Sequence, residues 1–247
     1  MDVRVGDEDD GGDGGSGFSG DAMSDTAGLR VMDDAPLRYL VSVPEDGGEA
    51  PRPVLCFLHG HDEAAPMNIT RALTLHGPLR PGSPPAARGF IVVAPQLPRA
   101  GDIWAHYAGE VRRIVAAVRA EHGGDARRTY LTGFSFGGNG VFDVALLQPG
   151  EWAALWSVDP TRVPREDPGV PLWLSIGGIA RRITPTFVGA LRLHRAAGAA
   201  PHGPRIWEDE GQDHVGSARM AYQDERIYAW LQSKALPDAA SYPIVVR

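Results

Sequence analysis

The chain has 247 residues, 43% of them hydrophobic, which is enough to bury the core of one α/β domain. Its formal charge of −7 comes from the first 28 residues, where eight acidic residues stand against Arg4, while the remaining 23 acidic and 23 basic residues balance. A neutral body argues against a nucleic acid or an anionic membrane as partner, and no apolar run approaches the ~20 residues that cross a bilayer.

The N-terminal segment, residues 1–30, is dominated by Gly, Asp and Ser, a composition that buries too little apolar surface to fold. We expect a disordered tail there and a folded domain over 31–247 that begins near Leu37. The segment has no basic start followed by an apolar stretch, as a secretory signal would have. Cys56 is the only cysteine, so the chain carries no disulfide framework, and we expect a cytoplasmic protein.

Beyond the tail, short apolar runs alternate with segments whose apolar residues recur at helical spacing. The runs are typical of buried strands, and Gly123-Gly124 gives one helical segment a natural end. We expect strands at residues 37–43, 54–58, 90–94, 129–132, 153–158, 170–176 and 204–207, and helices at 64–75, 103–121, 136–147, 185–197 and 217–231. Strands separated by helices predict an α/β protein, with a mostly parallel sheet covered on both faces and no large second domain.

One G-x-S-x-G pattern lies between an expected strand and an expected helix, at Gly133-Phe134-Ser135-Phe136-Gly137. This strand–turn–helix context is the one that a nucleophile elbow requires, because small residues two positions from the serine let the backbone pass. The helix that follows directs its N-terminal amides toward a developing oxyanion. The pattern predicts Ser135 as a nucleophile; a glycine-rich turn with an incidental serine is the alternative.

His214 is the best candidate for the base that activates such a serine. It follows the last expected strand and precedes the last expected helix, and where the serine lies on such an elbow the histidine comes last in the chain. A solvent-exposed loop histidine is the alternative. The other seven histidines fit worse, because they lie at an earlier strand end, on expected helices or on exposed loops: His59, His61, His76, His106, His122, His194 and His202.

The strand expected at 54–58 ends in His59-Gly60, where a glycine allows the backbone to approach closely. The next amide, that of His61, can face a carbonyl oxygen, and the Phe136 N–H can face it from the other side. We therefore expect Gly60, His61 and Phe136 to bind the oxyanion or the substrate; a simple turn at His59-Gly60 is the alternative.

No metal-ligand spacing, nucleotide-binding loop or nucleic-acid motif is present, so we expect no cofactor and no metal. His59 and His61 with Asp62 offer no further ligand at a workable spacing. Phe134, Phe136 and Trp104 are candidates to line an acyl pocket, although aromatic residues at such positions are more often plain core.

These motifs resemble those of the α/β hydrolases, in the branch of esterases and dienelactone-hydrolase-like enzymes that includes predicted peptidases and phospholipase/carboxylesterases. The resemblance extends over residues 37–233. It implies the α/β-hydrolase fold without a large lid, and a cofactor-free enzyme that cleaves carboxylic esters, thioesters or, rarely, amides. The matching stretches are 54–60, 73–78, 90–96, 128–138, 159–160 and 221–231.

The acid is the main departure from that family. The family's aspartate follows the penultimate strand, where this chain has Ala180 followed by two arginines. Asp159, at the end of the strand before, is one candidate replacement, although relatives with the usual acid also keep an Asp-Pro there. Asp213 adjoins His214, and neighbouring side chains seldom reach the required hydrogen bond. The chain is thus an enzyme with a relocated acid, a Ser–His dyad, or a relative that has lost activity.

Together these features predict a serine hydrolase that cleaves a carboxylic ester through an acyl-enzyme on Ser135, with His214 as base and Asp159 as acid. A thioesterase or acyltransferase with the same serine is the first alternative. A non-catalytic α/β-hydrolase-fold binding protein, suggested by Ala180, is the second. The expected partner is a small or medium acyl substrate, with no nucleic acid and no membrane, and the sequence does not determine the oligomeric state.

Overall fold

The computed structural model describes residues 28–33, 35–45, 51–162, 164, 166–177 and 212–238, together with the backbone of 206–209. The strands are β1 Leu29–Met32, β2 Tyr39–Ser42, β3 Arg52–Leu58, β4 Ile91–Pro95, β5 Gly124–Phe134, β6 Ala154–Val158, β7 Leu172–Gly177 and β8 Ile206–Asp209. The α-helices are α1 Ile69–Leu73, α2 Ala108–His122, α3 Phe136–Leu147, α5 His214–Gln223 and α6 Glu225–Gln232, and two short 3-10 helices are η1 Pro85–Gly89 and η2 Trp104–Tyr107.

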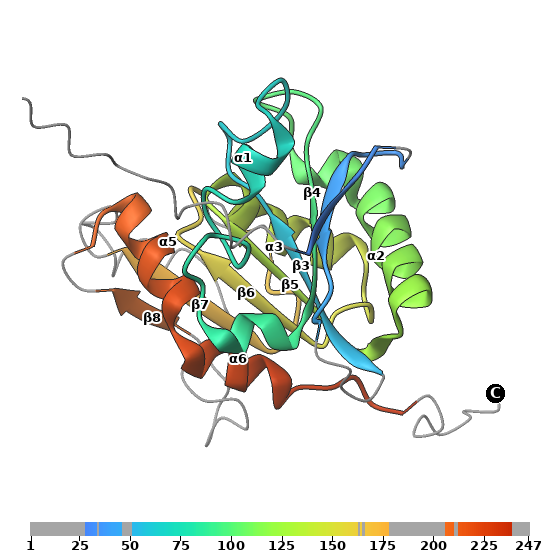
Figure 1. Ribbon diagram of the computed structural model, residues 1–247. Coiled ribbons are helices and arrows are strands. Elements are labelled where there is room, and N and C mark those ends of the chain that lie inside the picture. The colour runs from blue at the N-terminus through green and yellow to red at the C-terminus, as the bar shows by residue number, and fades with distance from the viewer. Residues whose placement is uncertain are drawn as a thin grey trace, which may run out of the picture.

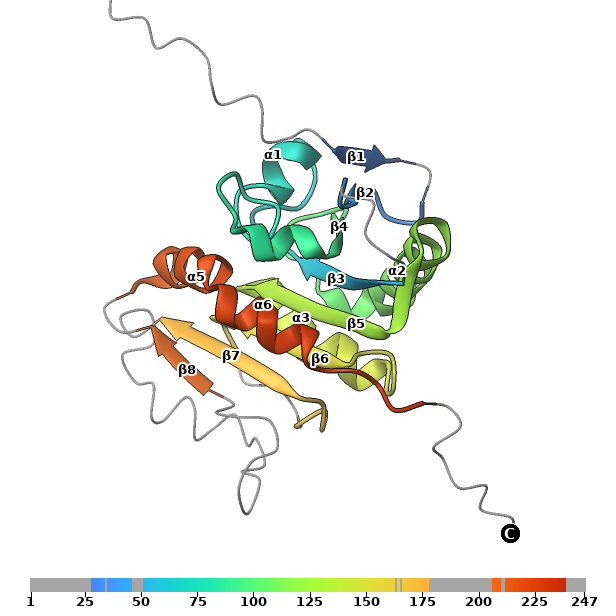
Figure 2. The same cartoon turned by 60° about the horizontal axis from the view of Figure 1, so that its bottom comes forward.

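Within the described residues, eight strands form one sheet in the order β1-β2-β4-β3-β5-β6-β7-β8. Strands β3 to β8 run parallel, β2 is antiparallel to β4, and β1 is antiparallel to β2. Helices cover both faces of this sheet (Figures 1 and 2). The predicted mostly parallel α/β architecture is confirmed, and each of the seven expected strands has a counterpart.

The side chains of β3 alternate between two hydrophobic cores, as a strand buried on both faces requires. Val54, Cys56 and Leu58 point to the core that α2 and α3 close. Leu55 and Phe57 point to the opposite core, which is closed by α1, α5 and α6. Complete burial raises the pKa of the Cys56 thiol, so it packs as a small apolar side chain rather than as a reactive thiolate.

Three expected helices differ from those in the structure. The helix expected at 103–121 is the 3-10 helix η2 followed by α2, which begins at Ala108. The helix expected at 64–75 is restricted to α1, because Asn68 caps it and starts it later. The helix expected at 217–231 is two helices, α5 and α6. Asp224 leaves the helical conformation between them, with ψ at 100°, and its side chain caps α6. Apolar residues recur at helical spacing across Asp224, so this periodicity does not reveal that α5 ends and α6 begins there.

The N-terminal boundary also differs, because the sheet begins at β1 rather than near Leu37. Leu29 and Arg30, which composition assigned to the tail, pair with Ser42 and Val41 of β2. A short strand is stable there because it satisfies backbone groups along the edge of β2. The rest of the expected tail, residues 1–27, and the helix expected at 185–197 lie outside the described residues.

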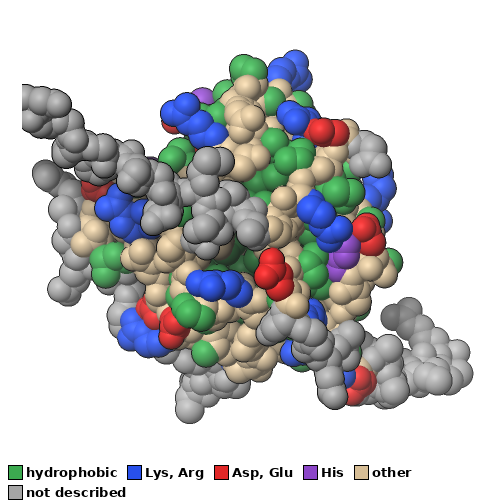
Figure 3. All heavy atoms as spheres, viewed as in Figure 1, with side chains coloured by type: hydrophobic (Ala, Val, Ile, Leu, Met, Phe, Trp, Pro, Cys, Tyr) green, Lys and Arg blue, Asp and Glu red, His purple; other side chains and the backbone are tan. Residues whose placement is uncertain are grey.

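On the face seen in Figure 3, Lys and Arg side chains are scattered among polar and apolar groups rather than gathered in one patch. This agrees with the balanced charge of the chain beyond residue 28. No helix of the described part is long and apolar enough to cross a bilayer. The absence of a large lid stays a prediction, because residues 178–205 lie outside the described residues.

Candidate active site

Ser135 lies in the sharp turn between β5 and α3, as the G-x-S-x-G pattern predicts. Its backbone has φ 58° and ψ −116°, a conformation that costs a non-glycine residue about 1–3 kcal/mol. The turn is held by the Ser135 N–H, which donates to the Val158 carbonyl of β6 at 3.0 Å. A Cβ on Gly137 would lie 1.8 Å from the Leu58 carbonyl oxygen, so this position admits no side chain.

His214, the first residue of α5, links Ser135 to Asp159. Its Nε2 lies 2.9 Å from Ser135 Oγ, and its Nδ1 forms a hydrogen bond with Asp159 Oδ2. An ionised carboxylate only accepts hydrogen bonds, so Nδ1 carries the proton and Nε2 is left to accept from the serine hydroxyl. The Phe134 ring packs against the imidazole at 4.6 Å between centroids, which restricts the orientation of His214.

Asp159 lies at the end of β6 and is fully buried. Besides its contact with His214, its Oδ1 accepts a hydrogen bond from the Gly177 N–H at 3.3 Å, and its own N–H donates to the Ser175 carbonyl at 2.8 Å. Parallel strands end on one edge of the sheet, which is why the end of β6 reaches the turn that follows β5.

Asp213, the other carboxylate considered as acid, has a different partner. Its side chain accepts a hydrogen bond from the Gly216 N–H at 2.7 Å and so caps α5. Of the two candidates, Asp159 is the one in contact with His214. Ala180 and the two arginines after it lie outside the described residues.

The expected oxyanion residues surround Ser135. A Cβ on Gly60 would lie 3.4 Å from Ser135 Cβ, so the turn after β3 touches the serine. The His61 ring meets the Phe136 ring edge to face, at 4.9 Å between centroids. The two loops whose amides were expected to bind an oxyanion therefore meet beside Ser135. Binding by the His61 and Phe136 amides themselves stays a prediction.

His59 is a structural residue. Its Nε2 accepts a hydrogen bond from the Leu97 N–H at 2.9 Å, so the proton is on Nδ1, which donates to the Gly60 carbonyl at 2.6 Å. Burial lowers the pKa of His59 to about 4. With both ring nitrogens occupied, His59 orients the turn that carries Gly60 and His61. Within the described residues, no group of three or more His, Cys, Asp or Glu side chains could hold a metal ion.

A largely buried pair beside the site, His76 and Glu63, was missed by sequence reasoning. His76 was among the histidines expected on helices or exposed loops, but its side chain is only 17% exposed, and its Nε2 lies 3.5 Å from Glu63 Oε1. Burial lowers the pKa of His76 to about 4, helped by the positive charge of Arg80. Burial also raises the pKa of Glu63. The sequence held no signal for this pair beyond the resemblance of residues 73–78 to the family.

Of the three aromatic residues considered for an acyl pocket, Trp104 and Phe134 are core residues and Phe136 is half-buried. A separate cavity of about 220 Å³ lies between the loop after α1 and helix α5. It is lined by Leu75, His76, Gly77, Arg80, Ser83, Val215, Ala218, Arg219, Tyr222 and Gln223. Ser135, His214 and Asp159 are not among the lining residues, but the His76 ring contacts the Phe134 ring, which packs on His214.

No protein-family model matches the chain, and neither does any curated protein. Solved structures do match. A thermostable esterase aligns with a TM-score of 0.64 and 20% identity over 86% of this chain and 64% of that one. The fluorophosphonate-binding serine hydrolase F of Staphylococcus aureus aligns with a TM-score of 0.55 and 14% identity over 79% of this chain and 92% of that one. The chain has the α/β-hydrolase fold.

A Klebsiella pneumoniae protein described as a dienelactone hydrolase also aligns, with a TM-score of 0.52 and 18% identity over 79% of this chain and 92% of that one. These structures belong to the branch of α/β hydrolases that the sequence resembles, so the fold expected from the resemblance is confirmed. The chain spans 64% of the length of the thermostable esterase. At identities of 20% or less the likeness establishes the fold, and the chemistry is argued from the site.

Proposed function

We propose that this α/β hydrolase is a serine hydrolase that cleaves carboxylic esters through an acyl-enzyme on Ser135. The observation that carries the proposal is the chain of hydrogen bonds from Ser135 through His214 to Asp159. In a relay of this kind the imidazole takes the serine proton, and the carboxylate fixes the tautomer and stabilises the imidazolium that forms. The three residues come from three different parts of the fold: the turn before α3, the end of β6 and the start of α5.

The reaction begins when Ser135 Oγ bonds to the ester carbonyl carbon while its proton passes to His214 Nε2. The carbonyl oxygen becomes an oxyanion, which the N–H groups of Phe136 and His61 stabilise. Collapse of this intermediate breaks the bond to the alcohol oxygen, which takes the proton from His214 and leaves. Water then attacks the acyl-enzyme with His214 as base again, and the carboxylic acid is released.

We propose a small-molecule ester with a small or medium acyl group as the partner. The cavity of about 220 Å³ is linked to the triad through His76, whose ring contacts the Phe134 ring beside His214. Its lining is mixed, with Arg80 and Arg219 beside Leu75 and Val215, so it offers space for a polar part of such a substrate.

A fluorophosphonate probe tests the proposal, because it labels only a serine that is activated as a nucleophile. We expect labelling of the wild type and none of Ser135→Ala. Ser233→Ala, at the end of α6 and away from the turn, is the matched control and should label as the wild type does. Absence of labelling in folded wild type would instead support a non-catalytic binding protein.

A thioesterase or acyltransferase using the same serine remains the second candidate, because both share the acyl-enzyme. Rates on matched esters and thioesters, with water alone or with an added alcohol as acceptor, separate these activities. The contact between Asp159 and His214 weighs against the binding-protein alternative, which was motivated by Ala180 in place of the usual acid.

A further inference from the structure

The loop after β6 carries Asp159 in an unfavourable backbone conformation. Asp159 has φ 41°, which is unfavourable for a non-glycine residue and persists only where surrounding contacts enforce it. The backbone of β7 holds Asp159 itself, through Ser175 and Gly177. The residues that follow Asp159 are held not by β7 but by helix α3.

Asn139, on the second turn of α3, provides the main attachment. Its side chain is buried. Its Nδ2 donates to Thr161 Oγ1 at 2.8 Å, and its Oδ1 accepts from the N–H groups of Thr161 at 2.9 Å and Arg162 at 3.1 Å. Because two N–H donors converge on Oδ1, the orientation of the amide is determined. All three hydrogen bonds of this side chain end on the segment directly after Asp159-Pro160.

Two further contacts join the chain around Asp159 to α3. Before Asp159, Ser157 Oγ of β6 donates to the Gly138 carbonyl at 2.9 Å. After it, Arg162 of the loop forms an ion pair with Asp143. The chain is therefore attached to α3 on both sides of the carboxylate. Since α3 begins at the residue after the proposed nucleophile, one helix supports both the serine and the acid.

We propose that Asn139 is a positioning residue, which holds the loop after Asp159 against α3 and so keeps the carboxylate within reach of His214. The inference rests on the proposed function, in which Asp159 is the acid. Asn139 acts through Asp159 and not on the substrate. Asp159 needs such support, because its own backbone conformation is unfavourable.

A double-mutant cycle tests this role, with hydrolysis of p-nitrophenyl acetate as the assay. Asn139→Ala should lower kcat about 10- to 100-fold with little change in KM, since small misplacements of catalytic groups cost this much. In an Asp159→Asn background the same substitution should change kcat by less than about threefold, because residues that act as a unit are not additive.

Gln148→Ala is the matched control. Gln148 is a buried amide at the other end of α3, and its side chain donates to the Ala108 carbonyl. Losing the Gln148 side chain should lower the melting temperature, as Asn139→Ala should, but leave kcat unchanged. If Asn139→Ala does not fold, Thr161→Ala removes only the Nδ2 contact and enters the same cycle. Its expected effect is about a two- to fivefold decrease in kcat that vanishes with Asp159→Asn.

The outcomes separate the inference from the function on which it rests. Equal losses of kcat from Asn139→Ala in both backgrounds, or an unchanged kcat in folded Asn139→Ala, would overturn the positioning role alone. An unchanged kcat in Asp159→Asn would overturn both this role and the acid assignment. Fluorophosphonate labelling of Ser135 reports on the nucleophile separately from either result.

Discussion

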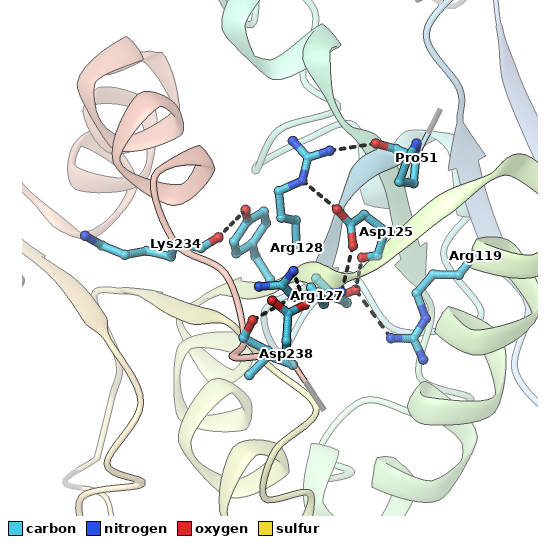
Figure 4. A network of polar contacts seen from close by, with 10 residues as sticks. Pro51, Arg119, Asp125, Arg127, Arg128, Lys234 and Asp238 are labelled. Atoms are coloured by element: carbon cyan, nitrogen blue, oxygen red, sulfur yellow. Dashed lines mark hydrogen bonds and ion pairs between the residues drawn. The ribbon is translucent and has the colours of Figure 1, made fainter. Parts of the chain in front are cut away.

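The carboxyl and amino ends of the parallel strands differ in how charged groups are buried and in backbone conformation. At the carboxyl edge, Ser135 and Asp159 both have positive φ, and the Asp159 carboxylate is fully buried. At the amino edge, Arg128 pairs with Asp125 at 2.7 Å and donates to the Pro51 carbonyl at 2.6 Å (Figure 4). The Arg128 and Asp125 side chains are partly exposed. Their backbones lie where the register between β5 and β3 shifts, and neither residue has a positive φ.

The same network joins the segment after α6, residues 234–238, to the first half of β5. Arg127 pairs with Asp238 at 2.5 Å, and Tyr130 Oη donates to the Lys234 carbonyl at 2.8 Å (Figure 4). The Arg127–Asp238 ion pair is replaceable, because exposed ion pairs contribute little individually.

Two carboxyl groups show the contrast between the edges most directly. At the carboxyl edge, burial raises the pKa of Glu63. At the amino edge, partial burial would raise the pKa of Asp125, but hydrogen bonds from the Arg128 side chain and the Arg127 N–H outweigh it and lower the pKa. Unfavourable conformations and desolvated charges thus gather where the chemistry is proposed, while the opposite edge secures the fold.

The largest effect is expected from Asp159→Asn. Loss of the charge that orients the imidazole should lower kcat by about 10⁴-fold, while the melting temperature changes little because the amide fills the same space. Steady-state ester hydrolysis and thermal melting followed by circular dichroism measure the two quantities. A kcat within tenfold of the wild type would show that the site works as a Ser135–His214 dyad.

Glu63→Gln should show a stability difference that grows with pH. Because the folded-state pKa of Glu63 lies above its ordinary value of 4.5, the folded wild type binds this proton more tightly than the unfolded chain does. The stability that this proton contributes to the wild type is therefore lost as the pH rises above 4.5 toward the folded-state pKa. The glutamine variant has no such loss, so the melting temperature of the variant should rise relative to that of the wild type between pH 4 and pH 8. A constant difference would mean that Glu63 is not desolvated.

Arg128→Ala should have a smaller effect on stability, and the difference from the wild type should change with pH in the opposite direction to that of Glu63→Gln. We expect a loss of about 1 kcal/mol in the free energy of unfolding near pH 7, reduced in 1 M salt by screening, with kcat unchanged. Asp125 has a lowered folded-state pKa, so its stabilising contribution is present above 3.8 and is lost as the pH falls through the folded-state pKa. The difference between wild type and variant should therefore narrow in acid. Denaturant unfolding at several pH values measures it, and an altered kcat would contradict the separation of the two edges.

The smallest effect is expected from deletion of residues 1–27. The composition of this segment offers no core to join, so the melting temperature and kcat should match the full chain. Deletion of residues 1–32 is the comparison, because it also removes β1 and leaves the edge of β2 unpaired. That longer deletion should lower the melting temperature by a few degrees. A drop with the shorter deletion would show that the tail packs on the domain.

Local patterns in the sequence were enough to predict the centre of the candidate site and most of the fold. Ser135 could be identified because the elbow needs glycines at fixed positions within five consecutive residues, and α3 followed with its predicted bounds. His214 could be identified from its place in chain order. The strands were recognisable because strands buried on both faces are continuous apolar runs.

Only the tertiary structure decided which groups meet at the site. The sequence allowed either Asp159 or Asp213 as the acid. The choice depends on where β6 ends relative to the start of α5, because Asp159 and His214 are 55 residues apart in the chain. Asn139 and Glu63 carried no local signal, since an amide on a helix or a carboxyl in a loop is ordinary until its partners are known. Periodicity and turn chemistry act over a few residues and can be read from the chain. The contacts that position a charge join segments distant in sequence, and these exist only once the sheet has brought them together.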